Sequence, residues 1–90
     1  MIIDLVLAGD GAYWRKRVEM TGPPPAGEEL VLVAAPEVVG VVVGSATPFD
    51  DDEGRVASVL LRAAPARSPA DRSDGLRRDG WSCLLQPGLA

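Results

Sequence analysis

The apolar residues of this chain are grouped in short runs that Gly, Pro and Asp separate. The largest group lies at residues 30–46, where Pro36 and Glu37 divide two runs of aliphatic residues, many of them branched at Cβ. Branched side chains suit a pleated sheet better than a helix, and runs of this length are typical of strands that are covered on both faces. The pattern therefore predicts two strands, at 29–34 and 38–46, in the centre of a small β-domain.

The first twenty residues predict a β-hairpin. Residues 2–8 are strand formers, and Gly9-Asp10-Gly11 tolerates the positive φ angles of a tight turn. A return strand follows at 12–20. The Pro-rich stretch 21–27 suits neither a helix nor a central strand, so we expect an extended connector there.

The return strand has two different faces. Trp14 and Lys16 lie on one face, and Tyr13, Arg15 and Arg17 lie on the other. A lysine on the apolar face predicts that this is an edge strand, that it contains a bulge, or that the lysine side chain extends along the surface to water.

After the central strands, turn signals and strand formers alternate. Residues 48–54 hold four consecutive acids and end in a glycine, which predicts a turn. Residues 55–63 predict a further strand, and residues 81–86 predict a short closing strand that returns its alternate residues to the core.

Residues 64–80 have a different composition, rich in Arg, Asp, Ser and Pro. Ser68-Pro69 followed by Asp71 is typical of a helix start, with a serine cap and a proline at the first helical position. Gly75 and the lack of an apolar stripe argue against a helix. A short helix near 68–78 and a mobile loop are therefore the two alternatives.

Several stretches together carry a resemblance to a known fold. They are strand ends, a Pro–Gly–Glu segment, an acidic turn and a following strand: Val18-Glu19, Pro23-Pro24-Pro25-Ala26-Gly27-Glu28-Glu29-Leu30-Val31-Leu32, Val38-Val39-Gly40-Val41-Val42-Val43, the acidic turn itself, and Arg55-Val56-Ala57-Ser58-Val59-Leu60-Leu61. Over residues 1–62 the chain resembles small uncharacterised SH3-like β-barrel proteins of bacteria and phages. The resemblance implies a barrel and a preference for binding roles, although a fold alone does not determine function.

The expected fold class is all-β, a small SH3-like barrel of five to six mostly antiparallel strands. Ninety residues make one domain, at 1–90. Within it we expect a barrel core at 1–63, a loop or short helix at 64–80 and the closing strand at 81–86.

The net charge of −4 is unevenly distributed. Residues 1–54 hold ten acidic and three basic residues, a net charge of −7, and residues 55–90 hold three acidic and six basic residues, a net charge of +3. Such asymmetry is typical of an interaction surface or a charged tail. It disfavours a generic nucleic-acid binder, since phosphate contacts need clustered positive charge.

Three charged segments are candidate sites. Tyr13, Arg15 and Arg17 could stack bases and hold phosphates or bind a partner, but paired or solvated arginines beside a core tryptophan are the simpler expectation. The acids at 50–53 could ligate a cation, but four consecutive acids point in different directions and favour a solvated turn. Five arginines of the C-terminal part could contact an acidic partner, but three aspartates dilute their field. These arginines are Arg62, Arg67, Arg72, Arg77 and Arg78.

An enzyme is difficult to build from these residues. The chain has no histidine, hence no Ser–His or Cys–His pair and no histidine metal ligand. Cys83 is the single cysteine and cannot form an intramolecular disulfide. It lies between Trp81 and Leu85 in the expected closing strand, so we expect a buried, inert thiol. We predict no catalytic residue, no cofactor and no metal.

The cellular setting follows from composition. Arginine outnumbers lysine eight to one, which is typical of a high-GC bacterium or its phages. The N-terminal residues lack the basic segment of a signal peptide, and 30–46 is too short and too interrupted for a membrane span. We expect a soluble protein of the cytoplasm, or of the virion if it is phage-derived.

The leading hypothesis is a small non-catalytic protein-interaction or assembly module, and a phage structural or accessory protein is one form that it could take. Its expected partner is another protein, a second copy of itself, or both, because the aliphatic strands hold more apolar surface than one small barrel can cover. The alternative is a nucleic-acid-binding barrel that uses Tyr13–Arg17. An enzyme of unknown type is the distant third hypothesis.

Overall fold

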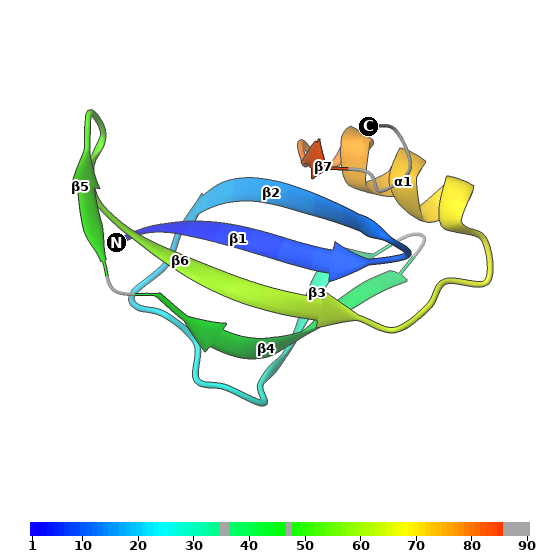
Figure 1. The fold of residues 1–90 in the computed structure, drawn as a ribbon, viewed down its shortest axis with the longest axis horizontal. Coiled ribbons are helices and arrows are strands. Elements are labelled where there is room, and N and C mark those ends of the chain that lie inside the picture. The colour runs from blue at the N-terminus through cyan, green and yellow to red at the C-terminus, as the bar shows by residue number, and fades with distance from the viewer. Residues whose placement is uncertain (35–36, 47, 86–90) are drawn as a thin grey trace.

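The structure, a computed structural model, describes residues 1–34, 37–46 and 48–85. The described part measures 35 × 29 × 21 Å along its principal axes and contains seven strands and one helix (Figure 1). In chain order they are β1 (Ile2–Gly9), β2 (Ala12–Glu19), β3 (Glu29–Ala34), β4 (Glu37–Ser45), β5 (Phe49–Asp51), β6 (Gly54–Ala63), α1 (Pro69–Arg78) and β7 (Ser82–Leu85).

The strands form one curled, mixed sheet that resembles half of a barrel. Neighbouring strands follow the order β3-β4-β6-β1-β2-β7, and β5 pairs with β6 outside this path. β1 and β6 are parallel, and the other pairs are antiparallel. Parallel neighbours cannot be joined by a hairpin, so the chain passes through β2, β3, β4 and β5 before it returns beside β1. The mostly antiparallel β-fold is confirmed, whereas a closed SH3-like barrel is not, because the described sheet is open.

The N-terminal hairpin is confirmed in its position and its turn type. Gly9 faces Ala12 across the strands, and Asp10 and Gly11 occupy the turn with φ angles of 52° and 71°. Positive φ at both central residues is the geometry whose twist matches that of a two-stranded antiparallel ribbon. The two-residue turn then determines which residues of β1 and β2 face each other.

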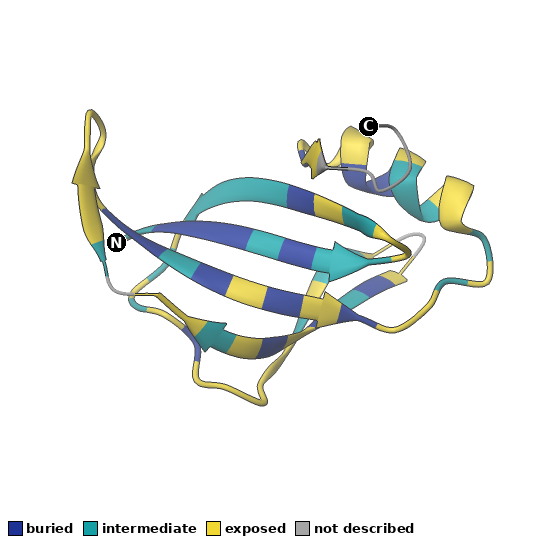
Figure 2. Cartoon of the chain, viewed as in Figure 1, coloured by how far each residue is buried: buried dark blue, intermediate teal, exposed yellow. Residues whose placement is uncertain are grey.

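The core lies in the concave side of the curled sheet. β1 and β6 run through its centre and hold most of the buried residues (Figure 2). Two residues of β4, two tryptophans and one helix residue complete the packing. The buried apolar residues of this core are Ile3, Leu5, Leu7, Trp14, Val38, Val42, Ala57, Val59, Leu61, Ala63, Leu76 and Trp81. The strands predicted for residues 29–34, 38–46 and 55–63 are all present, with ends that differ by at most one residue.

Gly40 allows the close approach of β4 to the core. A Cβ atom at this position would lie 3.2 Å from Leu61 Cβ and 3.2 Å from Leu32 Cδ1. Contacts this short are tighter than ordinary packing, so a side chain at this position would force Leu32 and Leu61 to shift where β4 crosses the core.

Of the two alternatives for 68–78, the structure has the helix. Ser68 caps α1, since its hydroxyl accepts a hydrogen bond from the Asp71 N–H at 3.3 Å. Leu76 is fully buried and anchors the helix to the core. Asp10, in the hairpin turn, accepts bonds from Arg72 Nη1 at 2.9 Å and from the Ala66 N–H at 3.0 Å, and so ties the helix to the first hairpin. At ten residues, and rich in charge, α1 lacks the length and apolarity of a membrane-crossing helix.

Two predictions in the C-terminal half need correction. The turn expected over 48–54 is confirmed only at residues 52–53, because β6 extends past the end of β4 and its free edge pairs with Phe49–Asp51, which form β5. Cys83 is exposed rather than buried. Trp81, just before β7, occupies the core position, and β7 then pairs with β2 at the margin of the sheet. The side chain of Leu85 and residue 86 lie outside the described part.

Candidate functional site

The outer face of the sheet, opposite the core, carries the most distinctive side chains. β1 directs Ile3, Leu5 and Leu7 into the core. Because successive side chains alternate between the two faces of a strand, Asp4 and Val6 lie on the outer face. The hairpin register places Arg17 opposite Asp4 and Arg15 opposite Val6. A carboxylate in the middle of the sheet thereby meets two arginines of the neighbouring strand.

Asp4 forms three hydrogen bonds with these arginines. Arg15 Nη2 donates to Asp4 Oδ2 at 2.8 Å, Arg17 Nε donates to Oδ1 at 2.8 Å, and Arg17 Nη2 donates to Oδ2 at 3.2 Å. Asp4 is only 5% exposed, whereas both arginines are partly exposed. A buried carboxylate needs such partners, because its burial without them is strongly unfavourable.

Arg17 extends this network to the acidic turn. Its Nη1 lies 2.9 Å from Asp51 Oδ2 and 3.2 Å from Glu53 Oε1. Arg17 thus connects β2 to β1 and to the β5–β6 hairpin. Its positive charge compensates the carboxylates of Asp51 and Glu53. Within the described residues, no three Asp, Glu, Cys or His side chains are arranged to hold a metal ion.

The arginines keep Asp4 ionised at neutral pH. The hydrogen bond from Arg17 lowers the pKa of Asp4 below its ordinary value, burial opposes this change, and Arg15 adds to the lowering. The same bond to Asp4 raises the pKa of Arg17 above its already high value. A carboxylate held this way has no proton to donate near pH 7, so the cluster is an ion-pair network rather than an acid–base pair.

The structure brings Tyr13, Arg15 and Arg17 to one face of β2, as predicted. Tyr13 is exposed, Trp14 is buried, and Asp4 engages both arginines. Asp4 itself did not emerge from the sequence reasoning. The signal that could have found it is the two-residue turn, whose register places Arg17 opposite Asp4.

An apolar hollow lies beside this network on the outer face. It has a volume of about 390 Å³ and spans β1, β4 and β6. No charged residue is among its lining residues, which are Val6, Val43, Gly44, Ser45, Ala46, Ser58, Val59 and Leu60. Val43 and Leu60 are 47% and 41% exposed. Exposed apolar surface that charged groups border is typical of a protein-interaction site.

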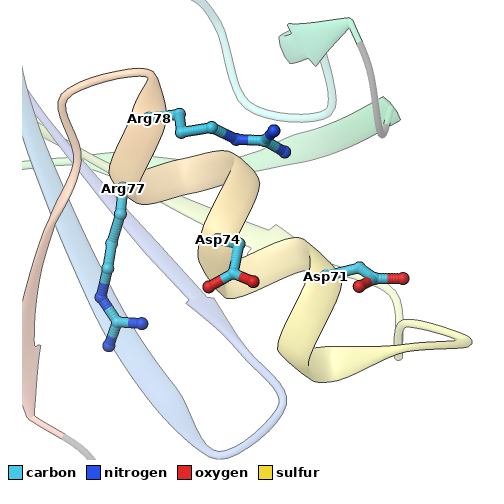
Figure 3. A pocket seen from close by; sticks show the side chains of 4 residues that line it. All are labelled: Asp71, Asp74, Arg77 and Arg78. Carbon is cyan, nitrogen blue, oxygen red and sulfur yellow. The ribbon is translucent and has the colours of Figure 1, made fainter.

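A larger hollow lies beside α1, but its lining does not indicate a particular ligand. It has a volume of about 540 Å³ and is lined by Asp71, Asp74, Arg77 and Arg78, all of them exposed. Figure 3 shows Arg77 and Arg78 pointing away from each other on different sides of the helix. The guanidinium carbon of Arg77 lies 5.2 Å from the centroid of the Trp14 ring, and Arg72 is paired with Asp10. The C-terminal arginines are therefore dispersed rather than gathered in one basic patch.

No protein-family model, curated protein or solved structure matches this chain. On the outer face of the described sheet, a partly shielded ion-pair network and a charge-free apolar hollow lie side by side.

Proposed function

We propose that this protein is a non-catalytic interaction module that assembles with a second copy of itself through the outer face. The single observation that carries the proposal is the charge-free hollow around Val6, Val43 and Leu60, which leaves aliphatic side chains in contact with water. Burial of apolar surface contributes about 25 cal/mol for each Å². Covering this face with a partner therefore stabilises the complex. The network around Asp4 holds the neighbouring strands rigid and borders the apolar area with charge.

The charge along β6 favours a second copy as the occupant. The acidic turn lies at the start of β6, and Arg62 lies on the outer face near its end. The acids at 50–53, balanced in part by Arg17 and Arg55, leave a net charge of −2 at the start of the strand. A two-fold axis that lies in the plane of the contact, perpendicular to β6, would place Arg62 of each copy opposite the acidic turn of the other. The contact is then self-complementary, as a closed dimer requires.

We also propose a relation to SH3-like barrels and an origin in a high-GC bacterium or its phage. Kinship with SH3-like barrels is supported by the curled sheet of mostly antiparallel strands, although the parallel β1–β6 pair departs from the expected pattern. The Arg-rich, Lys-poor composition supports a high-GC bacterium or its phage as the source. An assembly subunit, in the cytoplasm or in a virion, is the corresponding role.

Sedimentation equilibrium at tens of micromolar tests the proposal. The unaltered chain should form a dimer or a larger closed oligomer, and Leu60→Lys should weaken the association by at least about tenfold, because a lysine ammonium would enter an apolar contact. Leu84→Lys is the matched control, since Leu84 is 54% exposed on β7, outside the hollow. A 9.4 kDa monomer for the unaltered chain would overturn the proposal. So would an equal response to the two substitutions, with unchanged circular dichroism.

A further inference from the structure

The curled sheet leaves a second surface open, between β2 and β3. β3 pairs with β4 along one edge, and β2 pairs with β7 only over Tyr13–Arg15. Within the described residues, no strand therefore pairs with the outer edge of β3, or with the edge of β2 that faces away from β1 at residues 16–19. β3 passes behind β6 in the view of Figure 1, which shows how the sheet curls without closing. We call the space between these two edges the seam groove.

The seam groove has an apolar floor. Its volume is about 280 Å³, and residues of both strand edges line it. Leu5 and Trp81, both members of the core, belong to its lining, together with apolar side chains of the two edges: Val18, Met20, Leu30, Val31 and Leu32. An unpaired edge above an apolar floor is the arrangement that accepts an added strand, because the edge supplies backbone hydrogen bonds and the floor accepts alternate side chains.

The charges at the seam groove are predominantly acidic. Glu28 and Glu29 are exposed where β3 begins, and neither forms an ion pair with another described residue. Glu19, at the end of β2, lies 3.4 Å from the N-terminal ammonium. Lys16 also lines the groove, but it is already paired with Asp79. The Lys16 Nζ lies 2.7 Å from the Asp79 carbonyl oxygen and 3.1 Å from Asp79 Oδ2. An incoming segment therefore meets uncompensated negative charge near the start of β3.

We propose that the seam groove binds an extended, basic segment of a partner protein, which adds a strand to β3. Its alternate apolar side chains enter the floor between Leu5 and Trp81, and a Lys or Arg at one end faces Glu28 and Glu29. A second copy of β3 fits less well, because the charges nearest to it are also acidic, including Glu37 opposite Ala34. This site is separate from the outer face, so it does not depend on the proposed dimer.

Peptide binding tests this inference directly. The probe is a pool of seven-residue peptides with the pattern Lys-X-Thr-X-Thr-X-Lys, where X is Val, Ile, Leu or Phe. The control pool carries Glu in place of both lysines, and a second control pool carries Pro in place of the central X, which removes a backbone donor. The Lys-ended pool should perturb the NMR signals of the β3 amides and of the Trp81 indole N–H, which donates to Asp79 Oδ2 at 3.2 Å. The two control pools should have little effect.

Charge reversal at the rim provides the matched variants. Glu28→Lys/Glu29→Lys should weaken binding of the Lys-ended pool by about tenfold and improve binding of the Glu-ended pool, as expected for two exposed charges. Asp50→Lys/Asp52→Lys makes the same charge change at the acidic turn and should leave binding unchanged. Absence of binding at millimolar peptide, equal binding of the proline pool, or equal effects of the two double variants would overturn the inference. Loss of self-association in Glu28→Lys/Glu29→Lys would also overturn it, because a second copy would then be the occupant.

Discussion

Asp4→Asn is the substitution that most directly tests the ion-pair network of the outer face. The amide has nearly the shape of the carboxylate, so packing in the middle of β1 is preserved. The charge is lost, and the amide nitrogen cannot accept the hydrogen bonds that Arg15 and Arg17 donate. The variant therefore isolates the electrostatic contribution of Asp4 from its volume.

The expected loss is about 2 kcal/mol of the free energy of unfolding at pH 7. Hydrogen bonds to charged groups contribute about 1.5–3 kcal/mol each, and removing one partner of a fully buried ion pair costs about 3–5 kcal/mol. The cost is lower here because the Arg15 and Arg17 side chains are 41% and 24% exposed and regain water when Asp4 is neutralised. For a domain of this size the melting temperature should fall by about 10 °C.

The effect should depend on pH in one direction. The pKa of Asp4 is lower in the folded chain than the ordinary value of about 3.9 in an unfolded one. The contribution of Asp4 to stability is therefore fully present above that ordinary pKa, and it is lost as the pH falls through the folded pKa. The unaltered chain and Asp4→Asn should differ fully from pH 5 to 7, and the difference should shrink as the pH falls below the ordinary pKa of about 3.9.

Urea denaturation followed by tryptophan fluorescence, repeated from pH 7 to pH 2.5, measures this difference. Asp52→Asn is the matched control, because it removes the same charge from an exposed residue of the acidic turn and should change stability by less than about 0.5 kcal/mol. The reasoning would be refuted if Asp4→Asn changed the free energy of unfolding by less than about 0.5 kcal/mol at pH 7. It would also be refuted if the difference between Asp4→Asn and the unaltered chain stayed constant with pH.

Four further results follow from the structure. Leu76→Ala should cost about 3 kcal/mol in urea denaturation, because it leaves a cavity beneath α1; a cost below about 1 kcal/mol would contradict the packing of the helix. Ser68→Ala should cost about 1 kcal/mol by the same measurement, and Ser68→Asp, which can also cap, should not. Cys83 should react with a thiol reagent in the folded protein; protection until urea is added would place it in the core. Fluorescence polarisation should detect no DNA binding at physiological salt, since the arginines of β2 are paired. Micromolar binding that Arg15→Ala/Arg17→Ala removes would instead favour the nucleic-acid alternative.

Most of the strands and the start of the helix could be predicted because their sequence patterns involve only neighbouring residues in the chain. Branched aliphatic runs bounded by Gly and Pro predicted the central strands, and Gly9-Asp10-Gly11 predicted the first hairpin. For Lys16 the sequence left three alternatives, and the structure has the extended side chain, which reaches Asp79. The register shift of the β2–β7 pair lies away from Lys16, at Tyr13 and Trp14, and its extra residue is in β7. The candidate arginines were placed on the correct face of β2, because strand alternation is a local property.

The pairing of distant strands was decided only in three dimensions. No local signal shows that β6 returns parallel to β1, that β5 adds to the free edge of β6, or that Trp81 takes the core position and leaves Cys83 exposed. These outcomes depend on which strand edges and apolar faces remain uncovered after the rest of the chain has packed. The sequence by itself thus determined all the described strands except β5, together with their two faces. The tertiary structure decided which faces and edges meet each other, and hence that an apolar hollow on the outer face and the seam groove remain exposed to water.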